Sequence, residues 1–527
     1  MKRYLGITIG PVLRSLMMGV RPKELFTASY IHSLLSKTTI ITLLDDYKVE
    51  ARHIISPAFD QNVLSADKQV RLGVGMYPDR IFVEYDENNR IDDLLKLREA
   101  IMARFMKALG IADANKQNFI KHYFKIYMTE LDAEKGSEAV QKLNAALDNL
   151  ELHNVTPAED WETRNVVEDI IISPSDNPVW KDAFTEKAYI GNGKVIPFPS
   201  LEELALCREE EVTQCYHKYV CVVQADGDNM GKLISNVEQL ADKPSVSKVS
   251  QDIFDFCKVA THIIRTGTYE NGISDLCNTN KECIGLPIYA GGDDLLFIAP
   301  VVYTVKEHDE NGQEKIVRKT IFDMLKCIDE AYSNLVAKNR VIESDGKSYT
   351  THMSYGISIA YYKRPLYESL ADARNQLFGV AKNAFDGKKN CIAWKLTKHS
   401  GSTHAGVVIK GSSVYDSFID LLGFGADEEE KANQDILVSA VSHKIKNATD
   451  LMPLFHETGN TALRLQAFFD NVIDADEDLR DKGKYIDSVK ALLLSMYETS
   501  TDDLAKRAYD LLRTAKFICG LDELHEK

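Results

Sequence analysis

Residues 286–300 read LPIYAGGDDLLFIAP, in which an apolar run enters a Gly-Gly pair and two aspartates and a second apolar run leaves them. Two such runs joined by glycines are typical of a β-hairpin, so Asp293 and Asp294 are predicted to form an acidic tip. Gly291 and Gly292 allow a tight turn and a close approach of phosphate to the main chain. Carboxylates beside such a turn suit Mg²⁺ or Mn²⁺, which prefer oxygen ligands. Taken alone, the motif is equally compatible with an acidic turn in solvent.

A second acidic stretch lies upstream, where residues 219–232 read YVCVVQADGDNMGK. The β-branched run predicts a buried strand ending at Asp226 and Asp228, with a helix beginning near Asn229. Two-metal phosphoryl chemistry needs carboxylates from separate strands, which hold two cations roughly 3.5–4 Å apart. Asp226 and the tip of the 286–300 hairpin supply that set. Asp228 is a weaker candidate, because alternation along the strand turns it toward the opposite face.

Downstream, residues 355–362 (YGISIAYY) predict a third strand, and residues 371–394 (ADARNQLFGVAKNAFDGKKNCIAW) predict a helix that ends in a glycine turn. Three lysines near that turn, Lys382, Lys388 and Lys389, are candidates for contacts with phosphates. Lysines in such positions are also common on a solvated face, and this alternative stays open.

Taken in order, the DxD strand, the GGDD hairpin, the YGISIA strand and the lysine-bearing helix end resemble the palm of GGDEF-like cyclases. The segments ADGDNMGK (225–232) and YAGGDDLL (289–296), with YLGITIGPVLRSL and KELFTASYIHSLL near the N-terminus, resemble more closely the large polymerase-cyclase subunit of type III CRISPR effector complexes of the Cmr type. The likeness covers most of the chain. It implies that Asp226, Asp293 and Asp294 are catalytic and hold two Mg²⁺ or Mn²⁺ ions.

The same resemblance implies the residues that bind nucleotide. Gly291 and Gly292 would lie under the nucleotide, and Lys382, with Lys388 or Lys389, would contact the triphosphate of ATP.

The fold implied by the resemblance is α+β, with two ferredoxin-like, GGDEF-like palm domains, a helical linker and a helical C-terminal domain. Along the sequence, changes in apolar periodicity indicate four segments. By the same resemblance, they correspond to a first, non-catalytic palm at 1–90, a helical linker domain at 91–200, the catalytic GGDD palm at 201–400 and a helical C-terminal assembly domain at 401–527.

The first palm is expected to contain a strand at 4–9, a helix near 23–36 and extended segments at 53–56 and 80–85. By resemblance, this palm faces the second and helps to hold a second nucleotide. Ser29 and Tyr30 are the candidate contacts, with core packing as the alternative role of Tyr30.

The resemblance implies a nucleotidyltransferase that releases pyrophosphate from ATP and makes a cyclic oligoadenylate messenger for antiviral defence when target RNA is bound. The implied partners are the other subunits of a Cmr-type complex and, through them, a guide CRISPR RNA and the target RNA. Three alternatives stay open. The palm could join AMP to S-adenosylmethionine as co-substrate, it could be inert within a scaffold, or the chain could be a free-standing cyclic dinucleotide synthase.

Nucleotide choice is indicated by two positions beyond the DxD strand. Diguanylate cyclases place an Asn-Asp pair there to recognise guanine, whereas this chain has Ile234 and Ser235. Neither offers the carboxylate that would accept hydrogen bonds from guanine N–H groups. The chain therefore resembles the adenylate-using branch.

The composition limits the partners and the cellular compartment that are expected for this chain. The formal net charge of −16 makes this chain a poor candidate for gripping nucleic acid over its whole surface, so RNA contacts are expected to be local or shared with partners. The nine cysteines are odd in number and form no CxxC pair, which favours reduced thiols and argues against a zinc ribbon. No apolar run reaches the length of a membrane span, so a cytoplasmic protein without membrane contact is expected.

The N-terminal HD nuclease domain of many relatives is expected to be absent, because the first palm's strand begins at Tyr4. A signal peptide is not expected, because Pro11 and Arg14 interrupt the apolar run near the N-terminus.

Overall fold

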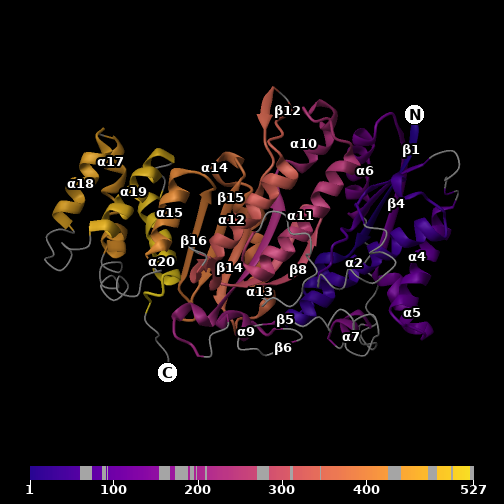
Figure 1. The fold of residues 1–527 in the computed structure, drawn as a ribbon, viewed down its shortest axis with the longest axis horizontal. Helices are drawn as coiled ribbons and strands as arrows, with labels where there is room; N and C mark the ends of the chain where they lie inside the picture. Colours follow the sequence, from indigo (N-terminus) through magenta and orange to yellow (C-terminus); the bar gives the residue numbers. More distant parts are fainter. Residues whose placement is uncertain are drawn as a thin grey trace.

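The computed structural model describes residues 1–59, 74–85, 91, 93–152, 166–172, 188–189, 195–196, 199–207, 211–269, 284–308, 313–344, 346–424, 441–457, 459–472, 483–499 and 503–522. These residues form an elongated molecule. Figure 1 shows an N-terminal sheet at one end, helices of the C-terminal part at the other end and a larger sheet between them.

The N-terminal sheet has the antiparallel strand order β2-β3-β1-β4. The strands are β1 Lys2–Gly10, β2 Ile54–Ser56, β3 Arg80–Tyr85 and β4 Lys125–Ala133. The first three agree with the expected strands. β4 is a correction, because only helices were expected between 91 and 200. Its sequence, KIYMTELDA, is largely polar and half-buried, so its period-2 signal is weak, and pairing along the whole of β1 decides its conformation.

The helical elements of this part are α1 Val12–Leu16, α2 Pro22–Asp45, η1 Ala51–His53, α4 Leu94–Ala108, α5 Ala114–Tyr123, α6 Gly136–Glu151 and α7 Val166–Ile172. α6 packs closely on β1, since a Cβ at Gly6 would lie 3.2 Å from side-chain atoms of Leu143 and Leu147. α2 is buried on almost every face, as expected of a helix that is covered from more than one side.

The larger sheet has the strand order β16-β15-β14-β7-β9-β8. Its strands are β7 Tyr219–Gly227, β8 Leu286–Gly291, β9 Asp294–Pro300, β14 Met353–Tyr361, β15 Cys391–Thr397 and β16 Thr403–Ile409. All neighbours pair antiparallel except β14 and β15. The hairpin predicted at 286–300 is confirmed as β8 and β9, and the predicted strands at 219 and 355 are confirmed as β7 and β14.

The helical elements between these strands are α9 Leu201–Leu206, η4 Cys215–Lys218, α10 Met230–Ser235, η5 Val237–Gln239, α11 Val246–Thr266, α12 Ile321–Tyr332, η6 Ser333–Ala337, α13 Leu366–Arg374, η7 Asn375–Ala381 and α14 Ala384–Gly387. The chain from α13 into η7 passes very close to β14. A Cβ at Gly356 would lie 2.2 Å from the carbonyl oxygen of Ala373, so only glycine fits there.

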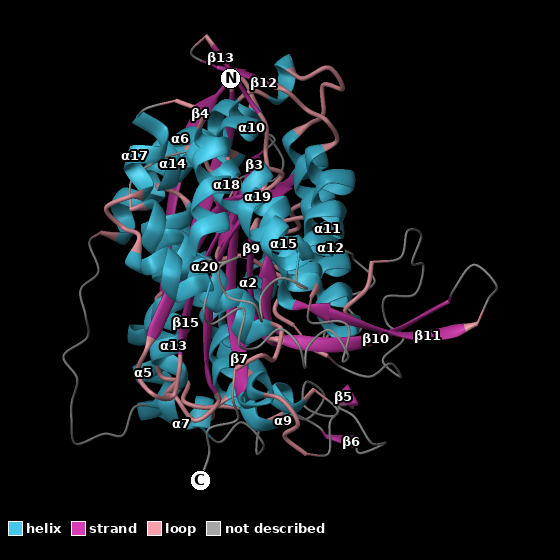
Figure 2. Ribbon diagram, turned by 90° about the vertical axis from the view of Figure 1, so that its left-hand side faces the viewer, coloured by secondary structure: helices cyan, strands magenta, loops and turns pink. Residues whose placement is uncertain are grey.

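Three short two-stranded pairs complete the strands. They are β5 Ala188–Tyr189 with β6 Val195–Ile196, β10 Val302–His308 with β11 Glu314–Thr320, and β12 Ile342–Ser344 with β13 Lys347–Tyr349. Figure 2 shows the β10–β11 ribbon projecting from the body of the molecule.

The two sheets are joined at the edge strand β8. Gly75, from the N-terminal part, forms a parallel bridge with Tyr289, and the Ala290 amide donates to the Gly75 carbonyl at 3.1 Å. The side chain of Ser33 on α2 accepts a 2.9 Å hydrogen bond from the Tyr77 amide. The N-terminal part is therefore fixed beside the hairpin that carries the two aspartates.

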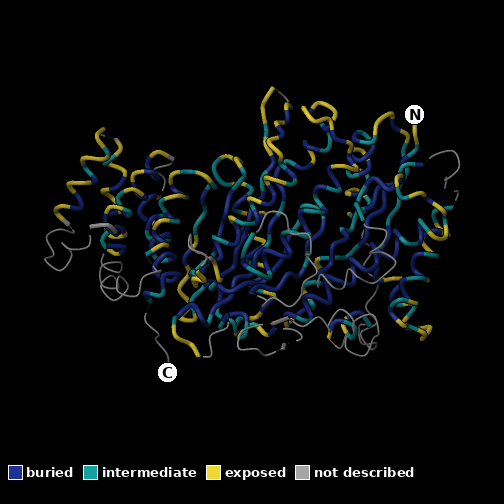
Figure 3. Tube along the Cα trace, in the orientation of Figure 1, coloured by how far each residue is buried: buried dark blue, intermediate teal, exposed yellow. Residues whose placement is uncertain are grey.

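The C-terminal helices are α15 Ser413–Gly423, α17 Met452–Glu457, α18 Thr461–Val472, α19 Gly483–Thr499 and α20 Leu504–Ile518. A purely helical segment was expected from 401, and β16 corrects this, because it extends the larger sheet through pairing with β15. α20 packs on that sheet, where the Trp394 indole donates to Thr514 Oγ1 at 3.1 Å. Figure 3 shows the buried core running from the N-terminal sheet through the larger sheet to these helices. None of the described helices is long and apolar enough to cross a membrane.

Candidate active site

The two acidic stretches meet at one end of the larger sheet. β7 and β9 pair so that Asp226 lies opposite Asp294, and the Gly227 amide donates to the Asp293 carbonyl at 3.0 Å. A Cβ at Gly227 would lie 2.8 Å from Asp293 Cβ, so glycine at this position is what lets the strand end and the hairpin tip approach. The structure thus brings together Asp226, Asp293 and Asp294, which lie far apart in the sequence.

The hairpin turn depends on its glycines in two ways. Gly292 has a φ of +63°, in the left-handed region that favours glycine. Gly291 has no room for a side chain, because a Cβ there would lie 2.7 Å from the Tyr289 hydroxyl and 2.9 Å from the Met76 carbonyl. The carbonyl of Gly292 also accepts a hydrogen bond from the Cys257 thiol, with a sulfur–oxygen distance of 3.3 Å.

The carboxyl groups at this tip are held in a fold that disfavours their ionised forms. Burial and, to a smaller extent, the nearby Asp226 carboxylate raise the pKa of Asp293 to about 7. Burial also raises the pKa of Asp294 well above its usual range, with a second contribution from Asp293. The pKa of Asp226 is raised by burial and held down in part by Lys382. Closely spaced, desolvated carboxylates of this kind are stabilised by a cation.

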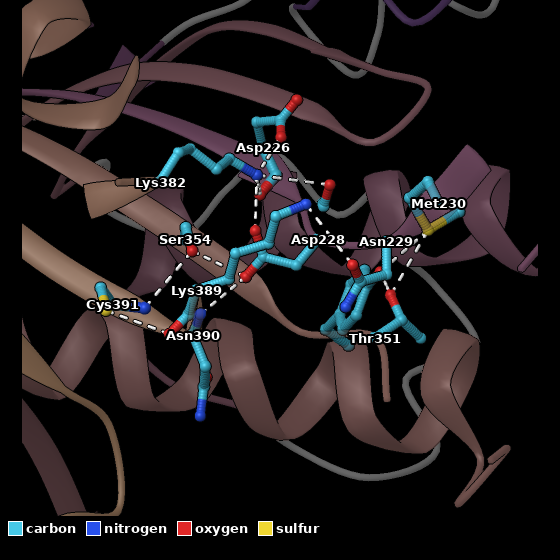
Figure 4. Close-up of polar contacts among 12 residues, drawn as sticks. Asp226, Asp228, Asn229, Met230, Thr351, Ser354, Lys382, Lys389, Asn390 and Cys391 are labelled. Carbon is cyan, nitrogen blue, oxygen red and sulfur yellow. Dashed lines mark hydrogen bonds and ion pairs between the residues drawn. The ribbon is translucent and has the colours of Figure 1, made fainter. Parts of the chain in front are cut away.

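Lys382 provides a positive charge within this cluster. Its Nζ pairs with Asp226 Oδ2, lies 2.6 Å from Asp228 Oδ1, and lies 3.1 Å from the Asp226 carbonyl and 3.4 Å from the Gly227 carbonyl (Figure 4). Burial disfavours the charged ammonium, but Asp226 and Asp228 outweigh this effect and raise the pKa of Lys382. The ammonium is therefore surrounded by oxygen atoms, as a bound metal ion would be.

Asp228 is completely buried and holds the strands around the site together. Its carboxylate accepts hydrogen bonds from Ser354 Oγ at 2.7 Å and from the main-chain amide of Asn390 at 2.9 Å. Its own main-chain amide donates to the His352 carbonyl at 2.6 Å. Figure 4 shows Asp228 between Lys382 and the start of β15. These contacts tie β7 to β14 and β15 directly behind Asp226.

The two other predicted lysines lie in the turn that leads to β15. Lys388 is exposed. Lys389 has a φ of +60°, and its Nζ lies 3.4 Å from Asn229 Oδ1. Both belong to the same end of the sheet as Asp226, so their contact with a triphosphate stays a prediction.

A cavity of about 180 Å³ opens between the N-terminal part and the larger sheet. Ser29 lines it, and Asp294 reaches it from the hairpin. Tyr30 is a buried core residue that stacks on Phe26, which agrees with the alternative given for it above.

The polar residues of this lining that sequence reasoning missed include His32, Asp79 and Arg374. They come from α2, from the turn before β3 and from the end of α13. No local motif marks them, because their proximity depends on how the N-terminal part docks against β8.

The carboxylate cluster has the ligand chemistry of a metal site but not a closed geometry. Among the described residues, no three carboxylate, imidazole or thiol groups stand close enough together to enclose an ion. The donor chemistry nevertheless suits Mg²⁺ or Mn²⁺, because hard oxygen donors gather at Asp226 and the hairpin, and their charge is balanced in part by the Lys382 ammonium. Asp226, Asp293 and Asp294 are the residues that would hold such ions.

Comparison with known proteins gives the class of this site. Residues 219–393 match the family model described as Cas10/Cmr2, second palm domain. This part of the chain is therefore similar to the second palm domain of Cas10/Cmr2, and it contains Asp226, Asp293, Asp294, Lys382 and Lys389.

One curated relative is consistent with the match to this family model. A curated relative, the CRISPR system Cmr subunit Cmr2 of Pyrococcus furiosus, is 29% identical over 201 residues, which are 36% of this chain and 20% of the relative. The matched region thus spans a fifth of the relative's length. The resemblance to the large subunit of type III CRISPR complexes that the motifs indicated is confirmed by the family model and this relative.

Two solved structures are similar to this chain. The Csm1–Csm4 cassette solved in complex with cA4 is 11% identical, covers 94% of this chain and 69% of its own chain, and has a TM-score of 0.51. A cryo-EM structure of a type III-B Cmr-beta complex in its apo state is 13% identical, covers 82% of this chain and 75% of its own, and has a TM-score of 0.44. The first of these confirms the α+β architecture over nearly the whole chain.

Proposed function

We propose that this chain is the nucleotidyltransferase subunit of a type III CRISPR complex and converts ATP into an adenylate messenger when target RNA is bound. The observation that carries the proposal is the meeting of Asp226 on β7 with Asp293 and Asp294 on the β8–β9 hairpin, beside Lys382. A palm with an inert surface turn has no need to hold three carboxyl groups in an environment that raises their pKa values.

The residues of the chain have distinct tasks in the reaction. Two bound cations would neutralise the triphosphate and activate the attacking oxygen. Asp226, Asp293 and Asp294 would place them, and the glycines of the turn allow the triphosphate to approach the main chain.

Lys382 is the residue positioned to exchange partners. Its ammonium would leave Asp226 as cations enter and would contact the triphosphate, while Asp228 retains it at the site. An acceptor hydroxyl then attacks the α-phosphorus in line, the bond to pyrophosphate breaks, and the chain contributes chiefly position and charge.

The leading product is a cyclic oligoadenylate, in keeping with the structurally similar Csm1–Csm4 cassette solved in complex with cA4. A second candidate is the transfer of AMP to S-adenosylmethionine. The observation that favours it is Asp79 on the cavity between the palms, because its carboxylate would pair with a positively charged acceptor, while Arg374 on the same lining would pair with a phosphate.

The proposed partners are the other subunits of a Cmr-type complex, a guide CRISPR RNA and the target RNA. The C-terminal helices are the proposed assembly surface. In support, α18 carries exposed Leu463 and α17 carries exposed Leu454, although polar side chains cover most of the remaining surface there.

The test is mass spectrometry of the products made by the assembled complex from ATP, with and without S-adenosylmethionine and with and without target RNA. Oligoadenylates and pyrophosphate from ATP alone support the cyclic product, whereas ATP consumption only with S-adenosylmethionine supports the adduct. The Asp226→Ala variant is the control. If wild-type complex consumes no ATP under any of these conditions, the palm is a scaffold and the proposal is wrong.

A further inference from the structure

Arg374 is a cation on the wall of the cavity between the palms, and it has no carboxylate partner there. It is the last residue of α13, it is exposed, and it contributes to the lining of the cavity. Among the residues that the structure describes, Arg374 forms no ion pair, whereas Arg364, just before the same helix, pairs with Glu368 and Asp372. A charged group placed in this way on a cavity wall is available to a ligand.

The ring of Phe378 holds the Arg374 side chain in place. The guanidinium carbon of Arg374 lies 4.9 Å from the centroid of this ring, and Phe378 is 39% exposed. A guanidinium over an aromatic face is attracted to it and keeps the N–H groups at its edge free to donate. Phe378 therefore fixes the direction of Arg374 without occupying its hydrogen-bond donors.

Arg374, Phe378 and Lys382 follow one another at intervals of four residues along one continuous helix. α13 passes directly into the π-helix η7, in which the Lys382 amide donates to the Leu377 carbonyl at 3.0 Å. Residues four apart lie close to one another on the same side of such a helix, so these three share one face. At the end of that face, Lys382 contacts Asp226 (Figure 4). The face therefore connects the cavity with the carboxylate cluster.

The sheet shows that the cavity and the carboxylates lie on the same side. Gln224, which lines the cavity, pairs opposite Leu296, and two residues further on Asp226 pairs opposite Asp294. Residues two apart on a strand point to the same face of a sheet. Gly356 lies opposite Gln224 on β14 and is the residue that α13 and η7 approach closely. The helix with Arg374 and Phe378 thus forms a shared wall of both sites.

The rest of the cavity lining differs from this wall. Leu13 and Leu16 of α1 are apolar, and Asp79 comes from the N-terminal part. Asp294 also reaches the cavity, but it belongs to the carboxylate cluster, whose charge bound cations would balance. Arg374 suits a phosphate oxygen, whereas Asp79 suits an N–H donor. A ligand with a phosphate at one end and N–H groups on an apolar ring at the other, such as an adenine nucleotide, fits this arrangement.

We propose that Arg374, held by Phe378, binds a phosphate of the acceptor substrate and thereby selects a nucleoside triphosphate over S-adenosylmethionine. The inference rests on the proposed function, which supplies the need for an acceptor and assigns Lys382 to the donor. Arg374 is then a specificity-determining residue, and Phe378 is a positioning residue that acts through the guanidinium. S-adenosylmethionine carries no phosphate and has a positively charged sulfur, so Arg374 offers it no attraction.

Four variants separate these roles. Arg374→Met removes the charge, and Phe378→Leu removes the ring beneath it. Phe378→Tyr keeps an aromatic face and should restore the effect of the ring. Lys363→Met is the matched control, because Lys363 is also exposed and lies 5.4 Å from the centroid of an aromatic ring, that of Tyr362, but near the other end of α13. Arg374 and Phe378 are both exposed, so none of these changes opens the core.

Binding is measured by calorimetry on the assembled complex, in chelator and in an Asp226→Ala background, which together disable the donor site. The probes are ATP, adenosine and S-adenosylmethionine. The parent should bind ATP about tenfold more tightly than adenosine, the effect of one charge-assisted hydrogen bond, and more tightly than S-adenosylmethionine. Arg374→Met should abolish the difference between ATP and adenosine, and Phe378→Leu should reduce it about threefold. Phe378→Tyr and Lys363→Met should bind all three probes as the parent does.

The inference is overturned if Arg374→Met binds ATP as tightly as the parent, or if Lys363→Met weakens ATP binding equally. It is also overturned if the parent prefers S-adenosylmethionine to ATP or binds none of the probes. If Phe378→Tyr binds ATP as weakly as Phe378→Leu, the positioning role of the ring is refuted. Failure of the proposed function has a separate signature, because wild-type complex with Mg²⁺ and target RNA then consumes no ATP, whereas the affinities measured in chelator require no turnover.

Discussion

The ammonium of Lys382 lies 2.6 Å from Asp228 Oδ1 and pairs at the same time with Asp226. One side chain thus connects a carboxylate proposed to hold a metal ion with a carboxylate that is fully buried behind it. The lysine balances the charge of the site when no cation is bound, and the buried aspartate keeps it there. Metal binding and lysine position are therefore linked.

Replacing Lys382 by Met should strengthen Mn²⁺ binding in the nucleotide-free protein and weaken ATP turnover. Mn²⁺ affinity should rise about tenfold, because the ammonium no longer competes for Asp226, and turnover should fall about a hundredfold, because the triphosphate loses a charged partner. Electron paramagnetic resonance of free Mn²⁺ measures the first effect. Lys388→Met, at an exposed position of the same turn, is the control. Unchanged Mn²⁺ affinity in Lys382→Met would contradict the competition.

Asp228→Ala should act on stability, in contrast to Asp226→Ala. Removing Asp228 leaves Ser354 Oγ, the Asn390 amide and Lys382 without their shared acceptor, which should lower the free energy of unfolding by about 2–4 kcal/mol. Urea denaturation measures it. The matched Asp226→Ala variant should unfold at the wild-type urea concentration or above and yet be inactive. Equal stability of Asp228→Ala and wild type would show that the buried contacts contribute little.

The double variant Asp293→Ala, Asp294→Ala should abolish ATP turnover without loss of stability. Both carboxyl groups have folded-state pKa values above the unfolded value, so they bind protons more tightly in the folded state. The contribution of Asp293 is therefore most favourable below about pH 4 and is lost as the pH rises through about 7, and the contribution of Asp294 changes in the same direction. In chelator, wild type should lose about 1–3 kcal/mol over this range relative to the double variant. If the free energies of unfolding of the two proteins changed with pH in parallel, the raised pKa values of Asp293 and Asp294 would be contradicted.

Much of the site was predictable because its signals are local. The hairpin follows from apolar runs flanking Gly291 and Gly292, and the strand ending at Asp226 follows from its β-branched residues. That these two acidic ends meet follows from antiparallel pairing of β7 with β9, which the resemblance to a palm implied.

Other features depend on contacts between distant segments. β4 was missed because its polar sequence becomes a strand only by pairing with β1, and β16 because it lies beyond the point where the helices were expected to begin. The cavity residues His32 and Asp79 carry no motif, since docking of Gly75 on Tyr289 sets their surroundings. Lys382 was predicted from the sequence as a phosphate contact, but its pairing with Asp228 was not.

ATP should be preferred over GTP as donor. The positions that recognise guanine in diguanylate cyclases are Ile234 and Ser235 here, and the Ser235 hydroxyl already donates to the Gly231 carbonyl at 2.8 Å within its own helix. A competition assay with equal ATP and GTP should give at least about tenfold more adenylate product, the discrimination expected from one missing hydrogen-bond partner. Equal incorporation would show that another part of the site selects the base.

His32 should make folding depend on pH in a direction opposite to that of the hairpin aspartates. The unfolded chain binds a proton at this histidine below about pH 6.5, whereas in the folded state its pKa is lowered to about 3 by burial. The unfolded state thus binds more protons between these limits, so the stabilising contribution is complete above about pH 6.5 and is lost as the pH falls. Gln at this position does not titrate. The difference in unfolding free energy between wild type and His32→Gln should therefore shift by about 2 kcal/mol against wild type when the pH is lowered from 7 to 5. Urea unfolding at the two pH values measures the shift, and Ser15→Ala, which keeps the imidazole, should retain the wild-type pH dependence. A constant difference between wild type and His32→Gln would mean that burial does not lower the pKa of His32 in the folded protein.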